Sequence, residues 1–291
     1  MRQYHDALQH VLDNGTDKDD RTGVGTRAVF GYQMRFDLRE GFPAVTTKKL
    51  AWKAVVSELL WFLEGSTDER RLAEIRYGAD RKDLVGKRTI WTDNADKQGR
   101  DLGWRNDAYY KGLGPVYGAQ WRGFNKDETG YGGVDQVARL LNDLQNTPDS
   151  RRHILTAWNP SQLHLMALPP CHLLAQFDVT NGRLSCQLYQ RSCDMFLGVP
   201  FNIASYSLLT HIFAKICDLE VADFVWTGGD VHIYRNHMSQ VREQLTRTPK
   251  ALPTLKMPNF TSLQDVLSAS VDDFVLQNYN PMDSIKAPMA V

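Results

Sequence analysis

The sequence predicts an α+β fold, in which a mixed, twisted β-sheet carries helices packed on one of its sides. Two observations support this class. Segments that alternate apolar and polar residues follow one another closely in the second half of the chain, as paired strands do. Long apolar segments with helical spacing lie elsewhere in the chain. Grouped strands with separate helices favour α+β over a regularly alternating α/β fold.

The first 65 residues predict a helix, a strand and a second helix. Tyr4, Leu8, Val11 and Leu12 share one face of the first helix, and Gly15 ends it. The second helix covers residues 52–63 and ends at Gly65. Strict alternation between the two helices predicts a long strand with one buried face, formed by Ala28, Phe30, Tyr32, Met34, Phe36 and Leu38.

The order of elements from residue 114 onward is helix, strands, buried helix and a last strand. We predict the first helix over residues 134–144, with Val134 at its start and an end near Pro148. The apolar stretch over residues 203–217 is typical of a buried helix. The predicted strands cover residues 153–158, 173–179, 184–190 and 221–226.

We interpret residues 1–291 as a single domain with a polar, variable excursion at residues 66–113. The excursion is rich in Asp, Arg, Lys and Gly, and its apolar anchors are isolated. Such a segment does not supply a second core, so we expect a solvated surface excursion, partly helical over residues 69–75.

The composition excludes several classes of function. Lys plus Arg and Asp plus Glu number 34 each, which argues against a diffuse basic face for nucleic acid. The amino terminus resembles no secretory signal, and no long apolar run suits a membrane span. Four cysteines without CxxC spacing favour neither a zinc site nor a disulfide framework. We therefore expect a cytoplasmic protein without a metal.

Two residues are candidates for chemistry because of their neighbours. Glu58 lies among apolar residues of a predicted helix, where a carboxylate needs a partner or a chemical role. Cys171 follows two prolines, which hold the backbone extended and present the thiol from a rigid turn. A buried, inert cysteine is the alternative. His172 makes a poor base for Cys171, because adjacent residues of an extended chain point in opposite directions.

Several arginines lie in loops or at strand ends. Arg21 lies in the glycine-bearing loop 20–26, Arg151 and Arg152 between a helix and a strand, and Arg191 at a strand end beside Ser192. Each alone suits a solvated surface, whereas together they suggest a phosphate clamp. Nearby guanidinium charge also predicts a higher thiolate fraction at Cys171.

Asn202, His232 and Tyr234 are candidates for recognising a nucleoside. Asn202 opens the buried helix, so it is either an N-cap or an amide that reads one edge of a planar base. His232 and Tyr234 share one side of a short extended stretch, suited to a sugar hydroxyl, although a capped strand end explains them equally well. Trp91 and Trp121 are most simply core or interface aromatics.

Taken together, these motifs resemble those of the thymidylate synthase family. The resemblance covers residues 1–65 and 114–291 in order. The segments that carry it are Asp20-Arg21-Thr22-Gly23-Val24-Gly25-Thr26, Glu58-Leu59-Leu60-Trp61-Phe62-Leu63, Pro169-Pro170-Cys171-His172, Gln190-Arg191-Ser192-Cys193-Asp194, residues 196–206, Gly228-Gly229-Asp230-Val231-His232-Ile233-Tyr234 and residues 285–291.

The resemblance implies methylation of dUMP to dTMP by 5,10-methylenetetrahydrofolate, the donor of both the one-carbon unit and the hydride. It implies that Cys171 adds to C6 of uracil, so that C5 becomes nucleophilic. Glu58 and Tyr117 are then expected to assist proton transfers, and Asn202 to read the uracil edge. The catalytic set implied is Cys171, Glu58, Tyr117, Arg191, Asp194 and Asn202.

The resemblance also assigns binding residues and a homodimer that forms through the sheet. The residues implied for dUMP are Arg21, Arg151, Arg152, His172, Gln190, Arg191, Ser192, Asp194, Asn202, His232 and Tyr234. Those implied for folate are Lys48, Ile90, Trp91, Leu168, Asp194, Gly198, Phe201 and Ala290. Arg151 and Arg152 are expected to reach the neighbouring subunit's site, and the last residues are expected to close over the folate.

The chain departs from the family pattern on the folate side. Thr92-Asp93-Asn94 stands where many members have an acidic pair and a second tryptophan, and Leu50-Ala51-Trp52 where many bacterial members carry a histidine. The segment 66–113 is longer than in compact bacterial members. The alternatives are a dUMP hydroxymethylase that uses water instead of hydride, a non-catalytic nucleotide- or RNA-binding relative, and a cysteine hydrolase.

Overall fold

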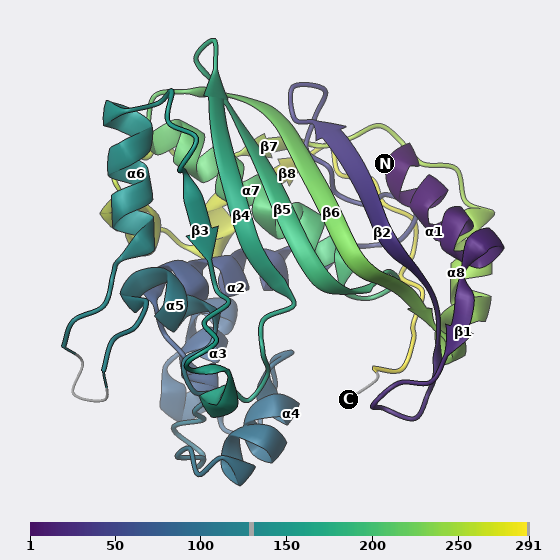
Figure 1. The fold of residues 1–291 in the computed structure, drawn as a ribbon, viewed down its shortest axis with the longest axis horizontal. Coiled ribbons are helices and arrows are strands. Elements are labelled where there is room, and N and C mark those ends of the chain that lie inside the picture. Colours follow the sequence, from purple (N-terminus) through teal and green to yellow (C-terminus); the bar gives the residue numbers. More distant parts are fainter. Residues whose placement is uncertain (128–130, 290–291) are drawn as a thin grey trace.

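The computed structural model describes residues 1–127 and 131–289 (Figure 1). Within this part of the chain, a six-stranded sheet has the order β1-β2-β6-β5-β4-β3. Its neighbours are antiparallel except β5 and β6, which are parallel, so the sheet is mixed as predicted. The strands are β1 (Thr16–Lys18), β2 (Thr26–Asp37), β3 (Ile154–Thr156), β4 (His172–Thr180), β5 (Arg183–Asp194) and β6 (Glu220–Tyr234).

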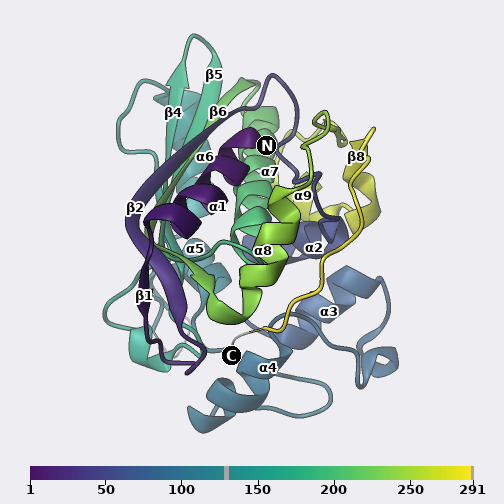
Figure 2. The same cartoon turned by 90° about the vertical axis from the view of Figure 1, so that its right-hand side faces the viewer.

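Helices gather on one side of the sheet. Figure 2 shows the sheet edge-on, with α1, α7 and α8 on the same side of it. The predicted α+β class is therefore confirmed. The helices are α1 (Arg2–Asn14), α2 (Trp52–Glu64), α3 (Glu69–Tyr77), α4 (Thr92–Asn94), α5 (Tyr117–Gly123), α6 (Gln136–Asn146), α7 (Val199–Ile216), α8 (Met238–Leu245) and α9 (Leu263–Ser268). A small antiparallel pair, β7 (Thr254–Lys256) and β8 (Val275–Gln277), lies outside the main sheet.

Helix α7 is the centre of the core. It is apolar nearly all round and contacts β5 and β6 on one side and α2 on another. The helix begins at Val199, earlier than predicted, because Pro200 fits the first turn, where a helix needs no N–H donor. The start at Val199 places Asn202 inside the helix. The N-cap reading of Asn202 is therefore wrong.

Three element predictions need correction. Phe30 is 82% exposed, because Gly31 has a φ of 85° that a regular strand does not contain, and the predicted buried face is interrupted there. Val134 lies before α6, whose N-cap Asp135 accepts a hydrogen bond from the Ala138 N–H at 3.0 Å. The stretch around His232 is the second half of β6 and not a separate short strand.

Two glycines explain why β6 runs on without a break. A Cβ on Gly228 would lie 2.4 Å from the Trp226 ring, and one on Gly229 would lie 2.9 Å from the Tyr189 hydroxyl. These glycines therefore permit close packing inside the sheet and do not form a turn.

The segment 66–113 is only partly the solvated excursion that we predicted. It contains α3, a 3-10 turn (Arg81–Leu84), α4 and the turn Ala95–Gly99, and it buries a charged pair, Glu69 and Arg70. One hydrophobic cluster extends from Met1 to Phe274, and we continue to interpret residues 1–291 as a single domain.

Candidate active site

Cys171 is held by its backbone at the entrance to β4. Its N–H donates to the Tyr117 hydroxyl at 2.7 Å, and its carbonyl accepts from the Arg191 N–H at 2.8 Å. The first contact ties the residue to α5 and the second ties it to β5. The thiol is partly exposed, so it is presented from a fixed turn, as the two prolines predict.

Arg191 supports the same turn from the side. Its Nε donates to the Pro170 carbonyl and its Nη2 to the Pro169 carbonyl, both at 2.8 Å. Nη2 also lies 3.9 Å from Cys171 Sγ, and the guanidinium stacks over Trp158 with its carbon 5.5 Å from the ring centre. Arg191 thus fixes the position of Cys171 and places a positive charge beside its sulfur.

The electrostatic balance at Cys171 differs from the sequence-based expectation. Burial raises the pKa of the thiol, while the Arg191 guanidinium and a hydrogen bond with Ser192 lower it by a smaller amount. The predicted effect of the guanidinium charge is therefore confirmed in its direction, while desolvation of the anion, which the sequence does not show, outweighs it.

Glu58 lies in α2 and accepts a hydrogen bond from Trp91 Nε1 at 2.7 Å. Burial raises the pKa of its carboxyl to about 7, while the indole donor and the charge of Arg76 act in the opposite direction. A carboxyl with a pKa near 7 exchanges protons readily at neutral pH. Trp91 is itself 6% exposed, so it has a hydrogen-bonding role as well as the packing role first expected.

Tyr117 lies between the Cys171 backbone and Trp91, the hydrogen-bond partner of Glu58. Its hydroxyl accepts from the Cys171 N–H, and burial together with the nearby Cys171 and Glu58 raises its pKa well above the usual value. The Tyr117 ring stacks on His172 with centres 4.1 Å apart. His172 donates to or accepts from Tyr206 through Nδ1 at 2.9 Å, and burial lowers its pKa to about 3. His172 is therefore a neutral spacer at physiological pH and not the base of a Cys–His dyad.

A chain of side-chain hydrogen bonds orients Asn202. Trp226 Nε1 donates to Gln190 Oε1 at 2.9 Å, and Gln190 Nε2 donates to Asn202 Oδ1 at 3.0 Å. An indole nitrogen can only donate, so the Gln190 amide has one orientation, which in turn leaves the Asn202 NH₂ group as a donor. Gln190 is 2% exposed and also donates to the Ser192 carbonyl at 3.0 Å. Gln190 therefore orients Asn202, and Trp226 is a functional neighbour that sequence reasoning missed.

His232 and Tyr234 share one side of β6, as predicted. Their ring centres are 5.1 Å apart, and His232 Nδ1 lies 2.9 Å from Asp230 Oδ1. Burial raises the pKa of Tyr234 to about 12, with smaller influences from the charges of Asp194, Asp20, Cys171 and Arg21. The Tyr234 hydroxyl thus remains protonated in a space that it shares with the predicted nucleophile and one predicted phosphate ligand.

Arg21 is exposed in the loop between β1 and β2. Asp20 builds this loop, because its carboxylate accepts from the Thr22 N–H at 3.0 Å and the Gly25 N–H at 2.7 Å. Gly25 has a φ of 76°, and a Cβ there would lie 2.9 Å from Arg235. The glycine is therefore required both by its backbone conformation and by the packing of Arg235.

Arg151 and Arg152 are exposed and far from Cys171 in the same chain. They precede β3, in which Ile154 pairs with Gln176 of β4. If the same register is extended by two residues, Arg152 lies opposite Asp178. That position lies seven residues along β4 from Cys171, or roughly 23 Å at the rise of a strand. Within one chain, these two arginines do not join Arg21 and Arg191.

Some of the predicted folate residues lie around the turn that follows β5. Asp194 Oδ1 accepts from the N–H groups of Phe196 at 3.0 Å and Leu197 at 3.1 Å, and this turn leads to Gly198 and Phe201 at the start of α7. Leu168 is half-buried, whereas Ile90 is 51% exposed. The structure thus gathers Asp194, Gly198 and Phe201 at one end of β5.

Lys48 lies beneath this turn. Its ammonium donates to the Phe196 carbonyl and lies 3.4 Å from the centre of the Phe196 ring. Burial lowers the pKa of Lys48 to about 7, and the charge of Asp194 acts in the opposite direction. Its binding role stays a prediction.

The carboxyl-terminal tail passes the same region. The Pro288 carbonyl accepts from His237 Nε2 at 2.6 Å, and His237 Nδ1 lies 3.9 Å from Asp194 Oδ1. Ala290, which we predicted to contact folate, lies outside the described residues. Over residues 1–127 and 131–289, no group of three or more His, Cys, Asp and Glu side chains is arranged for a metal ion. In this part of the chain, no helix combines the length and the apolar character that a membrane crossing requires.

The site has the parts of a nucleotide-modifying transferase: a presented thiol, a carboxyl poised near neutrality and an amide oriented toward a base. Comparison with known families agrees with this class. The family model described as thymidylate synthase matches residues 2–291. The chain belongs to the thymidylate synthase family and is a methyltransferase that methylates dUMP. The family uses a folate co-substrate.

The electrostatics of Cys171 predict its reactivity in the ligand-free protein. Iodoacetamide alkylates only the thiolate form of a cysteine. Because the pKa of Cys171 is raised, its thiolate fraction still increases with pH where an ordinary thiol is already fully ionised. We therefore expect the rate of alkylation by iodoacetamide to keep rising above the pH at which a peptide of residues 168–174 levels off. Mass spectrometry would separate Cys171 from the other cysteines. A plateau at lower pH than the peptide's would contradict this assignment.

Proposed function

We propose that the protein catalyses reductive methylation of dUMP to dTMP through a covalent bond between Cys171 and C6 of the uracil. The observation that carries this proposal is the contiguous group of Cys171, Tyr117 and Glu58. It combines a nucleophile, a hydrogen-bonded phenol and a carboxyl whose pKa is about 7. Methylenetetrahydrofolate supplies the one-carbon unit and the hydride when it is bound.

Cys171 begins the reaction by adding to C6, since C5 of uracil is otherwise too weak a nucleophile. The new C–S bond places the electron pair of the C5–C6 double bond onto C5 and O4. The Asn202 NH₂ group donates to O4, where negative charge develops, and its Oδ1 has a second lone pair for the N3–H. Cytosine has the opposite donor and acceptor pattern at these two positions, so this orientation favours uracil.

Tyr117 and Glu58 then serve proton transfer. Once C5 has bonded to the one-carbon unit that the folate would supply, removal of the C5 proton would leave an electron pair in the ring to expel the folate nitrogen from that carbon. Hydride delivered to the same carbon would then supply the pair that expels the Cys171 thiolate and restores the C5–C6 double bond. Tyr117 is close to the thiol, and Glu58 has a pKa that suits exchange of a proton at neutral pH. The Arg191 guanidinium stabilises the thiolate when it leaves.

The nucleotide's other groups are assigned by position. We propose that Arg21, Arg191 and Ser192 bind the phosphate, while His232 and Tyr234 bind the 3′-hydroxyl. His172 is proposed to contribute the ring edge that does not face Tyr206. Trp91, Ile90, Leu168, Asp194, Gly198, Phe201 and Lys48 are proposed to surround the folate.

A homodimer would complete the phosphate site. Arg151 and Arg152 lie too far from Cys171 to serve it within one chain, and over the described residues the sheet has a face without helices (Figure 2). Tyr189 and Ile154 are exposed apolar residues of this sheet, at 38% and 43% exposure. We propose that two sheets pack together, so that each subunit lends both arginines to its partner. The four free cysteines suit the proposed cytoplasmic location.

Product analysis tests the proposed reaction. With dUMP and methylenetetrahydrofolate, we expect dTMP and dihydrofolate in equal amounts, because the buried Trp91 keeps water from the intermediate. Chromatography of the nucleotides and absorbance of dihydrofolate measure both products. Accumulation of 5-hydroxymethyl-dUMP without dihydrofolate would instead identify the hydroxymethylase. Glu58→Gln should bind dUMP normally and turn over roughly 100-fold more slowly.

Mixed subunits test the shared site. Cys171→Ser subunits and Arg151→Glu/Arg152→Glu subunits should each be nearly inactive alone. In an equal mixture, heterodimers carry one complete site, so we expect about a quarter of the wild-type activity. Native mass spectrometry would confirm that heterodimers form. An inactive mixture that contains heterodimers would refute the donation of Arg151 and Arg152.

A further inference from the structure

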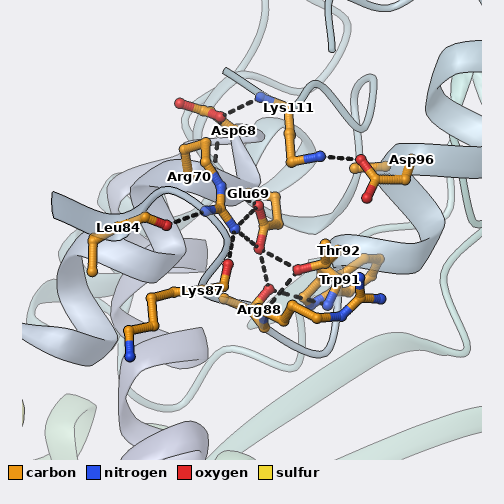
Figure 3. A network of polar contacts seen from close by, with 12 residues as sticks. Asp68, Glu69, Arg70, Leu84, Lys87, Arg88, Trp91, Thr92, Asp96 and Lys111 are labelled. Carbon is orange, nitrogen blue, oxygen red and sulfur yellow. Dashed lines mark hydrogen bonds and ion pairs between the residues drawn. The ribbon is translucent and has the colours of Figure 1, made fainter. Parts of the chain in front are cut away.

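The segment 66–113 contains a buried ion pair between neighbours in the sequence, Glu69 and Arg70 (Figure 3). Both stand in the first turn of α3, and their exposures are 0% and 2%. Burying two charges costs solvation free energy, and such a pair often stabilises a protein no more than apolar residues of equal volume. Its presence therefore calls for a role besides stability.

Arg70 ties α3 to the chain that follows it. Its guanidinium grips the Glu69 carboxylate with two hydrogen bonds, at 2.6 and 2.7 Å. It also donates to the carbonyls of Leu84 at 3.0 Å and Lys87 at 2.8 Å. The Arg70 N–H donates to the N-cap carboxylate of Asp68. The guanidinium therefore fixes the Glu69 carboxylate and the backbone of residues 84–87, which leads to the turn 89–92.

Glu69 in turn holds the turn that carries Trp91. One carboxylate oxygen, Oε1, accepts from the hydroxyls of Thr89 and Thr92, each at 2.7 Å. Because both hydroxyls donate to the carboxylate, their lone pairs are directed to backbone donors. The Thr89 hydroxyl accepts from the Trp91 N–H at 3.2 Å, and the Thr92 hydroxyl accepts from the Thr89 N–H at 2.8 Å.

Trp91 carries this arrangement to the reacting centre. Its indole N–H donates to Glu58 at 2.7 Å, and its ring packs against Trp61 and Tyr117 with centres 5.9 and 6.0 Å apart. A hydrogen bond of this kind depends on the position of the whole turn, because a shift of the backbone moves the donor at its end. Glu69 and Glu58 are thus joined through Thr89, Thr92 and Trp91.

We infer that the Glu69–Arg70 pair is a positioning element for the methyl-transfer reaction, which fixes the turn 89–92 and through it the indole donor on Glu58. The inference rests on the proposed role of Glu58. Both members of the pair are buried and bonded to protein groups, so their role is one of positioning. The hydrogen bonds of the pair give the Thr89 and Thr92 hydroxyls, the backbone donors of the turn and the Trp91 indole single orientations. The Glu58 carboxylate therefore keeps one hydrogen-bonding environment during turnover.

The pH dependence of turnover reports this role. Several groups face Glu58: Trp91 and Arg76 of the segment 66–113, Tyr117 of α5 and Tyr206 of α7, while His172 of β4 lies behind Tyr117. Burial keeps both tyrosines and His172 neutral near pH 7. The indole donor stabilises the Glu58 carboxylate, so its loss raises the pKa of Glu58 above its present value of about 7.

The test replaces the pair and follows the pH profile of kcat/KM with dUMP and methylenetetrahydrofolate. In Glu69→Met/Arg70→Met, we expect the limb assigned to Glu58 to move up by about one pH unit and kcat to fall on the order of tenfold. Affinity for dUMP should stay unchanged. Glu74→Gln is the matched control, since Glu74 lies in the same helix and pairs with Arg81 at 2.9 Å. Its profile should equal that of the wild type.

The same replacement in a Trp91→Phe variant tests whether the pair acts on Glu58 through Trp91. Trp91→Phe removes the indole donor, so the pair's replacement should have no further effect on the pH profile of that variant. Full additivity would overturn the inference, and so would a wild-type profile in the folded double variant. If the double variant does not fold, the pH profile of Thr92→Val replaces its own as the test. This substitution removes the hydrogen bond from Thr92 to Glu69. A wild-type profile in Thr92→Val would then overturn the inference. A wild-type enzyme that makes no dTMP would count against the proposed function instead.

Discussion

The site depends on how Arg191 and two prolines hold Cys171. Pro169 and Pro170 hold the backbone extended and exclude a helix at this point, so their carbonyls are available to a side-chain donor. Arg191 donates to both carbonyls, and its own backbone N–H donates to Cys171. The Tyr117 hydroxyl accepts from the Cys171 N–H. The thiol therefore has a fixed position before any substrate arrives, which lowers the entropic part of the barrier to attack.

Burial sets the ionisation of the groups around the thiol. It raises the pKa of Glu58 to about 7, lowers that of His172 to about 3, and raises the pKa of Cys171 against the influence of Arg191. Desolvation is thus the largest influence in all three cases. The result is a division of ionisation states: the Glu58 carboxyl has a pKa near neutrality, His172 stays neutral and packs against Tyr117, and Arg191 opposes the effect of burial on Cys171.

The sequence predicts those features that depend on neighbours along the chain. The prolines before Cys171 reveal a presented thiol, and apolar periodicity reveals helices α2 and α7, because both signals are local. The role of Gln190 is not local, since it depends on Trp226, which approaches it from a parallel strand. The role of Gly228 is not local either, since close packing inside β6 depends on the side chains that approach it, among them Cys193 of β5.

The segment 66–113 also contains a feature that depends on distant contacts and that the sequence therefore does not predict. Its many charged residues predict a solvated surface, and most of them fulfil that prediction. Glu69 and Arg70 differ from most of the others in being buried, and their partners are each other, Thr89, Thr92 and backbone carbonyls. A prediction from composition places Glu69 and Arg70 on the surface with the other charged residues, because composition does not show which carboxylate is buried.

The central claim is that Cys171 bonds covalently to the nucleotide during turnover. The most direct measurement is the mass of the intact protein after rapid acid quenching of a reaction with dUMP and the folate, followed by peptide mapping. The account predicts a transient increase by the mass of one nucleotide, located on the peptide that contains Cys171 and absent from Cys171→Ser. A modification on another residue, or full turnover by Cys171→Ser, would contradict it.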